Sequence, residues 1–278
     1  MKKILALTLA LALVLSLGVT ALADTTIRVG ASPTPHAEIL AEVVDILAEQ
    51  GITLEIIEYT DYVQPNLAVD SGDIEANYFQ HTPYLNTFNE ENDTHLVSVG
   101  LIHYEPFGIY AGKTASLEEL EDGATIAIPN DGSNETRALL LLQQEGLITL
   151  AEGIDASSNA TVYDIAENPH NYVFNEVEAA QLTNVLQDVD LAVINGNYAL
   201  DAGLNAGTDA LAVEDASGDG AQTYANILCV KEGNENNEAV QALLAALQSD
   251  EVAEFIAETY EGAVVAIFTT EEAEEAAE

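Results

Sequence analysis

Apolar residues recur along this chain in two alternating patterns, one typical of buried strands and the other of amphipathic helices. Residues 27–30 form a short apolar strand, and residues 37–47 carry Ala, Leu and Val at helical spacing until Gly51 ends the run. Residues 53–59 are rich in β-forming side chains and predict the next strand. This β-α-β opening favours a mostly parallel sheet covered by helices.

The same rhythm returns after Lys113 and predicts a second set of strands and helices. An apolar strand over residues 124–128 is followed by a turn and a helix over residues 134–144, and residues 189–194 form another buried strand. The later expected elements are a strand at 224–230 and helices at 238–247 and 252–260. No sequence repeat accompanies this rhythm, which by itself indicates two α/β lobes.

The first 23 residues have the composition of an export signal. Lys2 and Lys3 precede a long apolar run that closes on Ala21-Leu22-Ala23, the small-x-small pattern that signal peptidases cut. We therefore expect a mature chain from Asp24. The alternative is an uncut anchor, because the run is close to the ~20 residues that span a bilayer.

The one cysteine, Cys229, limits both redox chemistry and membrane attachment. It permits no internal disulfide and no Cys-x-x-Cys metal or redox site, and we expect it to be a small buried residue. No cysteine follows the apolar N-terminal run. We therefore expect an exported, periplasmic or cell-surface protein without a lipid-anchor cysteine, held at the membrane only by a partner or by an uncut N-terminal segment.

Chain length supports the division into lobes, because roughly 255 mature residues exceed the usual size of a single core. The expected segments are a signal peptide at 1–23, the first part of lobe 1 at 24–110, lobe 2 at 111–210, a return to lobe 1 at 211–268 and an acidic tail at 269–278. The tail is expected to lack regular structure.

Charge is the extreme feature of the composition. The chain has 48 Asp and Glu residues against 6 Lys and Arg, and its formal charge of −42 becomes −44 once Lys2 and Lys3 leave with residues 1–23, which contain no acid. Such a chain lacks the clustered cations that nucleic acid requires, and its 48% hydrophobic content argues against disorder. The charge is typical of a protein used in brine, although an acidic surface kept for solubility alone is the alternative.

Scarcity of cations makes Arg137 the first candidate for binding chemistry. We expect it in the first turn of the helix after the strand at 124–128, where free N–H groups and the helix dipole favour an anion. Its planar guanidinium can hold a carboxylate through two hydrogen bonds. Residues 130–137 are therefore interpreted as a carboxylate clamp. The alternative is an ion pair with Glu135, Glu145 or another acid.

Two further groups of residues have the character of a ligand site. Aromatic residues make up only 6% of the chain, yet they cluster between Tyr62 and Tyr84, and such rings suit an apolar or thioether side chain. Asn195 and Asn197 follow the buried strand at 189–194, and ligands of α/β sheets bind at such strand ends. An ordinary core under a loop and a plain turn are the respective alternatives.

The sequence contains no Gly-x-Ser-x-Gly, His-Glu-x-x-His, Gly-x-x-x-x-Gly-Lys or Gly-x-Gly-x-x-Gly motif. We therefore expect a binding protein without a cofactor rather than an enzyme. A zinc-binding carrier is the main rival, since three histidines could meet a carboxylate across a cleft. The five candidates are His36, His81, His95, His103 and His170. A surface protein that binds nothing small is a third hypothesis.

Seven segments, in order and spacing, resemble the methionine-binding NlpA-type lipoproteins of bacterial ABC importers. They are GASPTPHAEIL, YTDYVQPNLAVDSGDIEANYFQHTPYL, HYEPFGIYAGK, IPNDGSNETRALLLLQ, AAQL, INGNYAL and YEGAVV, between Ile27 and Phe268. The resemblance implies a type II periplasmic-binding-protein fold, with two α/β lobes around a ligand cleft. It also implies capture of an amino acid such as L-methionine for the permease of an ABC importer, and we expect a monomer.

The matching motifs also imply which residues bind the ligand. Tyr62, Phe79, His81 and Tyr84 would surround its side chain, Asn134 and Arg137 would hold its carboxylate, Asn195 would approach its backbone, and Asn226 is a weaker match. Two departures from the family pattern stand out. The usual lipid-modified cysteine is missing, and the clamp loop has Gly132-Ser133 and Thr136 where Pro-Thr and Gly are commoner.

The export signal predicts a mature N-terminus at Asp24. Mass measurement of the protein from its native host tests this prediction. An intact mass that includes residues 1–23 would show that the segment is retained as an anchor.

The mature charge of −44 predicts that thermal stability rises with KCl up to molar concentrations, because the Debye length shrinks to roughly 3 Å and acid–acid repulsion is screened. Matched melting curves in sucrose separate screening from general exclusion effects. A melting temperature that stays flat from low to molar salt would contradict the prediction.

Overall fold

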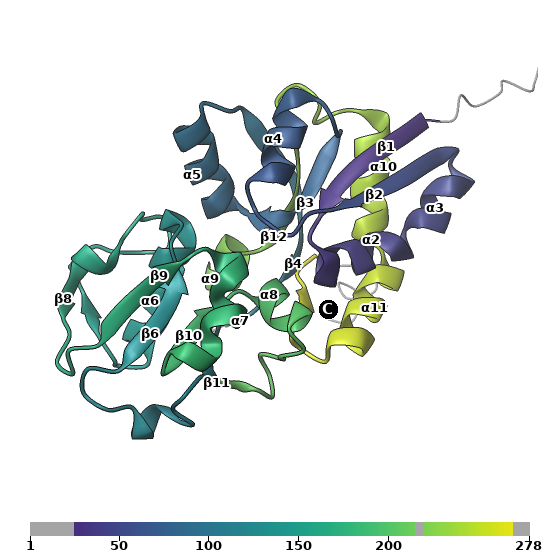
Figure 1. Cartoon of the computed structure of the whole chain (residues 1–278). Helices are drawn as coiled ribbons and strands as arrows, with labels where there is room; N and C mark the ends of the chain where they lie inside the picture. Colours follow the sequence, from purple (N-terminus) through teal and green to yellow (C-terminus); the bar gives the residue numbers. More distant parts are fainter. Residues whose placement is uncertain (1–24, 215–218, 269–278) are drawn as a thin grey trace, which may run out of the picture.

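The chain forms two α/β lobes, shown as a computed structural model in Figure 1. The structure describes residues 25–214 and 219–268. The predicted signal peptide at 1–23 and acidic tail at 269–278 lie outside these residues. Within them, no helix is both long enough and apolar enough to cross a membrane.

The first lobe is built on a six-stranded sheet with the order β13-β4-β12-β3-β1-β2. Its strands are β1 (Thr25–Ala31), β2 (Ile52–Glu58), β3 (Ala76–His81), β4 (Leu96–Tyr104), β12 (Asn226–Lys231) and β13 (Val265–Ala266). Its helices are α2 (Glu38–Glu42), α3 (Val44–Glu49), α4 (Gln64–Ser71), α5 (Thr82–Asn92), α10 (Glu238–Leu247) and α11 (Asp250–Tyr260).

The second lobe is built on a five-stranded sheet with the order β11-β5-β10-β6-β9. Its strands are β5 (Gly108–Ala111), β6 (Thr125–Pro129), β9 (Val173–Val177), β10 (Leu191–Ile194) and β11 (Ala210–Val213). Its helices are α6 (Gly132–Gln144), α7 (Leu182–Val185) and α8 (Gly196–Asp201), and α9 (Asp219–Thr223) precedes the return to the first sheet. A separate two-stranded sheet joins β7 (Thr149–Leu150) and β8 (Ile165–Glu167).

Both sheets are mixed, so the expectation of a mostly parallel sheet is wrong. β1 runs parallel to β2 and β3, but β12 is antiparallel to both β3 and β4. In the second sheet β6 is parallel to β9 and β10, whereas β5 is antiparallel to β10 and β11. The antiparallel part of the first sheet arises where β12 returns from the second lobe and enters between β3 and β4, and where β13 pairs with the outer side of β4.

The helix predicted at 37–47 is interrupted at one residue. Val43 has φ −99° and ψ 1°, which separates α2 from α3. The apolar face of this helical region is buried as predicted: Leu40, Val43 and Leu47 all lie in the core of the first lobe. The second lobe has its own core, to which β6 contributes Ile126 and α6 contributes Leu139.

The chain crosses between the sheets twice, once between β4 and β5 and once between β11 and β12. The crossing segments lie between Tyr104 and Gly108 and between Val213 and Asn226, and residues 215–218 of the second lie outside the described part of the chain. We propose these segments as the lobe boundaries, a few residues from the positions at 110 and 210 expected from the sequence.

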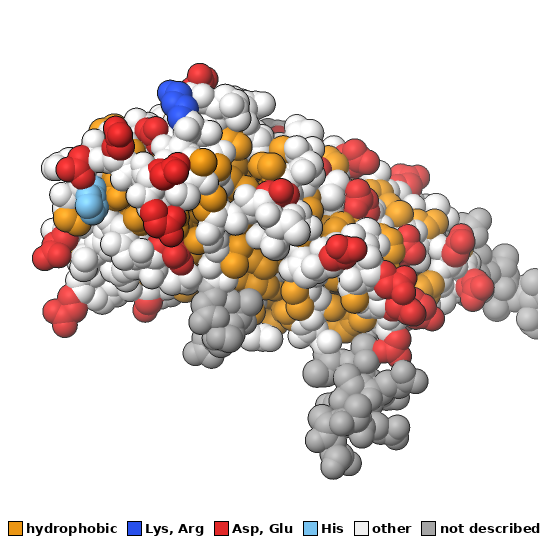
Figure 2. Space-filling view, turned by 90° about the horizontal axis from the view of Figure 1, so that it is seen from below, with side chains coloured by type: hydrophobic (Ala, Val, Ile, Leu, Met, Phe, Trp, Pro, Cys, Tyr) orange, Lys and Arg blue, Asp and Glu red, His pale blue; other side chains and the backbone are white. Residues whose placement is uncertain are grey.

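Acidic side chains are spread over the face shown in Figure 2, whereas basic side chains are scarce there. Among the described residues, Arg137 is the buried cation, with 4% of its surface exposed. The other cations have local partners: Arg28 pairs with Glu75, Lys231 pairs with Asp70, and Lys113 donates to the backbone oxygen of Asp188. Arg137 is therefore the cation that the fold keeps away from water.

Candidate functional site

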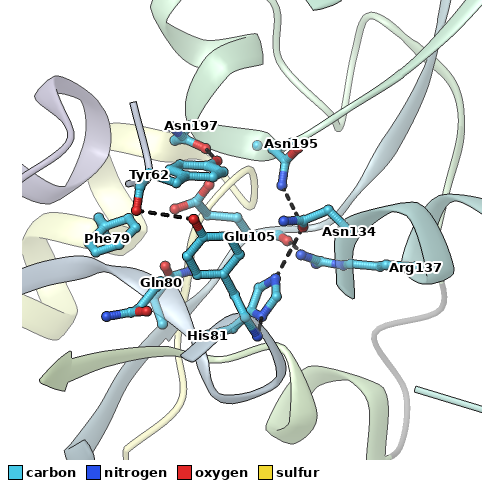
Figure 3. A pocket seen from close by; sticks show the side chains of 12 residues that line it. Tyr62, Phe79, Gln80, His81, Glu105, Asn134, Arg137, Asn195 and Asn197 are labelled. Atoms are coloured by element: carbon cyan, nitrogen blue, oxygen red, sulfur yellow. Dashed lines mark hydrogen bonds between the residues drawn. The ribbon is translucent and has the colours of Figure 1, made fainter. Parts of the chain in front are cut away.

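A cavity lies where strand ends of the two lobes meet, and all eight residues singled out from the sequence line it (Figure 3). They are Tyr62, Phe79, His81, Tyr84, Asn134, Arg137, Asn195 and Asn226. Gln80, Glu105, Gly196 and Asn197 complete the lining. The cavity volume between these side chains is about 20 Å³, room for about one water molecule, so an amino acid would enter only if they moved apart.

Aromatic rings form one wall of the cavity. The ring centroid of Tyr62 lies 5.6 Å from that of Phe79 and 5.5 Å from that of Tyr84, in tilted and edge-on arrangements typical of aromatic packing. Tyr84 also donates from its hydroxyl to the backbone oxygen of Tyr62 at 3.1 Å. With Phe88, these rings form a small hydrophobic cluster. The aromatic residues are therefore both a local core and a wall of the cavity.

A chain of hydrogen bonds crosses from the first lobe to the second through His81, Asn134 and Asn195. The Nδ1 atom of His81 accepts the backbone N–H of Tyr84 at 3.2 Å, so the proton is on Nε2, which donates to Oδ1 of Asn134 at 3.1 Å. The same oxygen accepts from Nδ2 of Asn195 at 2.8 Å. Burial, with a smaller contribution from Arg137, lowers the pKa of His81 to about 3, so the ring is a neutral donor at pH 7.

This series of hydrogen bonds leaves the amide oxygen of Asn195 without a partner. Because Nδ2 of Asn195 is used by Asn134, its Oδ1 atom must point elsewhere, and this buried oxygen makes no hydrogen bond to the described residues. Asn197 presents the opposite case: its Oδ1 accepts from the Tyr62 hydroxyl at 2.5 Å, and its buried Nδ2 has no partner within the described part of the chain. Unpaired buried polar atoms are costly. Two residues that line the cavity thus have an amide atom, one acceptor and one donor, without a partner among the described residues.

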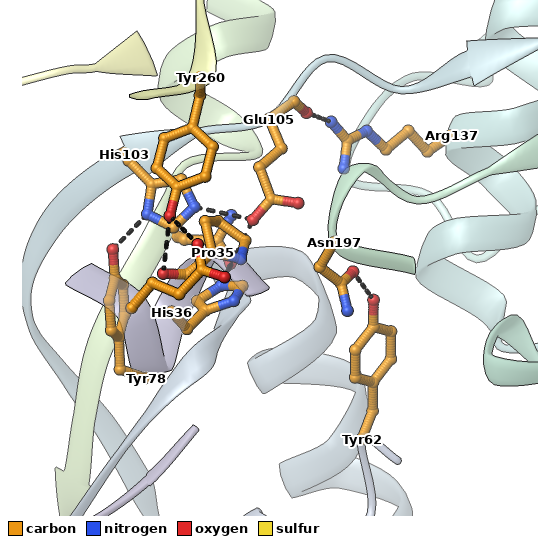
Figure 4. A network of polar contacts seen from close by, with 11 residues as sticks. Pro35, His36, Tyr62, Tyr78, His103, Glu105, Arg137, Asn197 and Tyr260 are labelled. Carbon is orange, nitrogen blue, oxygen red and sulfur yellow. Dashed lines mark hydrogen bonds and ion pairs between the residues drawn. The ribbon is translucent and has the colours of Figure 1, made fainter. Parts of the chain in front are cut away.

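Glu105 is the one acid among the residues that line the cavity, and the sequence analysis missed it. Its Oε1 atom lies 2.7 Å from Nε2 of His103 and 3.4 Å from Nε2 of His36 (Figure 4). A Cβ at Gly196 would lie 2.7 Å from the other oxygen, Oε2, so only glycine lets α8 approach this closely. Burial raises the pKa of Glu105, although His36 and Arg137 oppose the shift.

The setting of Arg137 differs from the one predicted. Helix α6 begins at Gly132, two residues earlier than expected, so Arg137 lies in its second turn rather than its first. Asp131 caps the helix by accepting the backbone N–H of Asn134 at 3.0 Å. Asp131 therefore uses one of the N–H groups at the helix N-terminus, and the expectation that Arg137 lies in the first turn beside them is wrong.

Arg137 already has an acidic partner, though neither of the two named from the sequence. Its Nε atom donates to both carboxylate oxygens of Glu214, at 3.1 and 3.0 Å, and its Nη2 atom donates to Glu214 Oε1 and to the backbone oxygen of Glu105, the latter at 2.8 Å. Burial disfavours the charge of Arg137, but Glu214 outweighs this effect and the pKa is raised. The acid-pair alternative is thus realised with Glu214, and the two-bond edge of the guanidinium is occupied.

The structure does not gather three histidines around a carboxylate, as the zinc hypothesis required. Within the described residues, the one group with metal-ligand spacing is His36, His103 and Glu105, whose ligand atoms lie within 4.8 Å of one another. His36 also pairs with Oδ1 of Asn226 at 2.9 Å. Since His103 and Glu105 are already at hydrogen-bond distance, a metal ion would have to replace that bond.

Comparisons with known proteins agree on one family. The family model described as NlpA lipoprotein matches residues 27–268. The membrane lipoprotein TpN32 of Treponema pallidum is 46% identical over 256 residues, which cover 91% of this chain and 93% of that protein.

Two solved structures are similar to this chain over most of its length. A putative lipoprotein from Ruminococcus gnavus is 55% identical with a TM-score of 0.86, covering 87% of this chain and 99% of that one. A nutrient binding protein from Burkholderia cenocepacia, solved bound to methionine, is 46% identical with a TM-score of 0.81, covering 87% of this chain and 100% of that one.

Each buried histidine contributes stability that is lost in mild acid. The pKa of His81 drops to about 3 and that of His36 to about 4 on folding, from an ordinary value of 6.5. Below that ordinary value the unfolded chain binds protons that the folded chain does not, so lowering the pH from 7 to 5.5 should reduce the free energy of unfolding by roughly 1 kcal/mol per such histidine. Urea unfolding in molar KCl measures this change.

Two variants isolate the histidine contribution to this pH dependence. His81→Gln should remove about 1 kcal/mol of the change between these two pH values, whereas His95→Gln, at an exposed position, should retain the wild-type pH dependence. Glu135, whose pKa burial raises to about 7, changes the free energy of unfolding in the opposite direction, so the comparison of variants is the test: equal pH dependence of His81→Gln and wild type would contradict the prediction.

Proposed function

The chain belongs to the NlpA lipoprotein family, and from that premise we propose that it is an extracytoplasmic solute-binding protein that captures L-methionine and delivers it to an ABC importer. The methionine-bound Burkholderia structure supports the ligand, because it is 46% identical over nearly the whole described chain. We further propose that the protein is a monomer that catalyses no reaction and meets the membrane through its importer.

One observation carries this proposal: a single buried guanidinium and a single buried carboxylate line the same cavity. Arg137 and Glu105 are 4% and 5% exposed, and they supply opposite charges to a space otherwise lined by rings and amides. A free amino acid carries the complementary charges, an ammonium and a carboxylate on one carbon atom. The unpaired acceptor of Asn195 and the unpaired donor of Asn197 match the same two groups.

Each residue receives a role from this arrangement. The carboxylate of the ligand would bind Arg137 and Nδ2 of Asn197, and its ammonium would bind Glu105 and Oδ1 of Asn195. Asn134, expected on the carboxylate, donates from Nδ2 to Asp131 and accepts at Oδ1 from two neighbours. We therefore assign it to holding His81 and Asn195 in place.

The aromatic wall suits the side chain of methionine. A thioether gains favourable contacts at ring edges, and the rings of Tyr62, Phe79 and Tyr84 present both edges and faces. His81 borders the same wall, with its ring centroid 6.4 Å from that of Tyr84. Asn226 contributes to the site through its hydrogen bond to His36.

Zinc remains the second candidate ligand, because His36, His103 and Glu105 have metal-ligand spacing. Glu105 is a binding residue in both hypotheses, so methionine and Zn²⁺ would compete for it. Titration of the purified protein with L-methionine and, separately, with Zn²⁺ distinguishes them. If Zn²⁺ gives a heat of binding and L-methionine gives none, the metal-carrier hypothesis replaces the methionine proposal.

Substitution of Arg137 in the clamp and of Phe79 in the aromatic wall should change ligand affinity in different ways. Removing one partner of a buried charge pair costs roughly 3–5 kcal/mol, and each ~1.4 kcal/mol is tenfold in affinity. Arg137→Ala should therefore weaken methionine binding by about 10² to 10⁴-fold and weaken alanine binding similarly, since both ligands present a carboxylate. Phe79→Ala should instead reduce the preference for methionine over alanine. Calorimetric titration with both amino acids measures these affinities.

Arg28→Ala is the matched control, because it removes an arginine whose side chain is 39% exposed in its pair with Glu75. It should bind both amino acids with wild-type affinity. An Arg137→Ala protein that melts cooperatively and binds methionine within about threefold of wild type, a difference below ~0.7 kcal/mol, refutes the clamp.

A further inference from the structure

Glu214 occupies a central position beside the clamp without lining the cavity. Its Oε1 atom accepts the Tyr104 hydroxyl at 2.6 Å and the backbone N–H of Phe107 at 2.9 Å, in addition to its bonds with Arg137. The side chain is 13% exposed. A carboxylate held by this many donors on separate segments has one fixed orientation.

This arrangement determines which part of Arg137 remains for a ligand. A guanidinium has five N–H groups in a fixed plane. Glu214 takes the Nε group and one Nη2 group, and the backbone oxygen of Glu105 takes the second Nη2 group. The hydrogen bonds of Arg137 to Glu214 and Glu105 all use Nε or Nη2, so Nη1 is the group that remains for a ligand.

Aromatic rings hold the guanidinium in this orientation. The Cζ atom of Arg137 lies 4.3 Å from the ring centroid of Tyr224 and 4.8 Å from that of Phe107. Figure 3 shows the side chain reaching from α6 toward Glu105 and Asn134 at the cavity. A ligand carboxylate would therefore meet Arg137 end-on, at Nη1, rather than along the Nε–Nη2 edge.

Glu214 also connects the clamp to both crossing segments. It directly follows β11 and begins the segment that returns to the first sheet, while Tyr104 precedes the outward crossing and Phe107 is its last residue. The bonds with Phe107 are reciprocal, because the backbone N–H of Glu214 donates to the Phe107 oxygen at 3.0 Å. The residue that orients Arg137 is thus fixed at the point where the two crossings lie together.

We propose that Glu214 is a positioning residue for ligand recognition: it holds the Nε–Nη2 edge of Arg137, directs Nη1 to the ligand carboxylate, and links that orientation to the crossing segments. This inference rests on the proposed function, since it concerns how a carboxylate is recognised. The competing view is that Glu214 merely neutralises Arg137 and competes with the ligand. The two views predict opposite signs, because removing a competitor strengthens binding whereas removing a positioning group weakens it.

The test is calorimetric titration of the full chain and its Glu214 variants with L-methionine and with L-methionine amide, which lacks the carboxylate. Glu214→Ala should weaken methionine binding by at least about tenfold while changing amide binding by less than about threefold. A general structural defect would weaken both ligands equally. Glu214→Gln keeps an oxygen that can accept from Arg137 and Tyr104, so it should bind methionine within about fivefold of wild type.

Glu167→Gln is the matched charge control on the same lobe, since Glu167 is exposed on β8, and it should bind like wild type. The inference is overturned if Glu214→Ala binds methionine as tightly as wild type or more tightly. It is also overturned if the affinities for methionine and for the amide fall by the same factor. If Glu214→Ala does not fold, Glu214→Gln decides: methionine binding equal to wild type or up to about fivefold weaker supports the inference, and tighter binding overturns it. A wild-type protein that binds neither compound overturns the proposed function instead.

Discussion

A buried guanidinium must have a carboxylate beside it, and this constraint organises the structure around the cavity. Arg137 lies among the rings of Tyr224 and Phe107, where an unpaired charge would be expensive. Glu214 compensates the charge and at the same time joins the end of β11 to the segment that follows β4. The fold, the crossing segments and the clamp are consequently connected through one ion pair.

The same constraint explains the division of charge between surface and interior. Among the described acidic residues only Glu105 and Glu135 are buried, and the others lie where water and salt reduce their repulsion. In the cavity, by contrast, Glu105 is held by His36 and His103, whose pKa values burial lowers to about 4 and about 3, so both rings are neutral at pH 7. A carboxylate with neutral neighbours keeps its attraction for a ligand ammonium, while Arg137 supplies the opposite charge across the cavity.

The sequence predicted the parts of this molecule that depend on scarcity or on local pattern. Arg137 was found because cations are rare, the aromatic wall because rings are rare, and α10 because its apolar spacing is regular. Glu105 and Glu214 were missed, since no acid stands out among 48. The antiparallel insertion of β12 also escaped prediction, because it depends on pairing with distant strands and not on its own residues.

The most direct measurement of the central claim is a crystal structure of the protein with L-methionine bound. It should show the ligand carboxylate on Nη1 of Arg137 with the Glu214 pair intact, the ammonium on Glu105 and Oδ1 of Asn195, and the thioether against Tyr62, Phe79 and Tyr84. A ligand whose carboxylate displaces Glu214 from Arg137, or whose ammonium lies away from Glu105, would contradict the account.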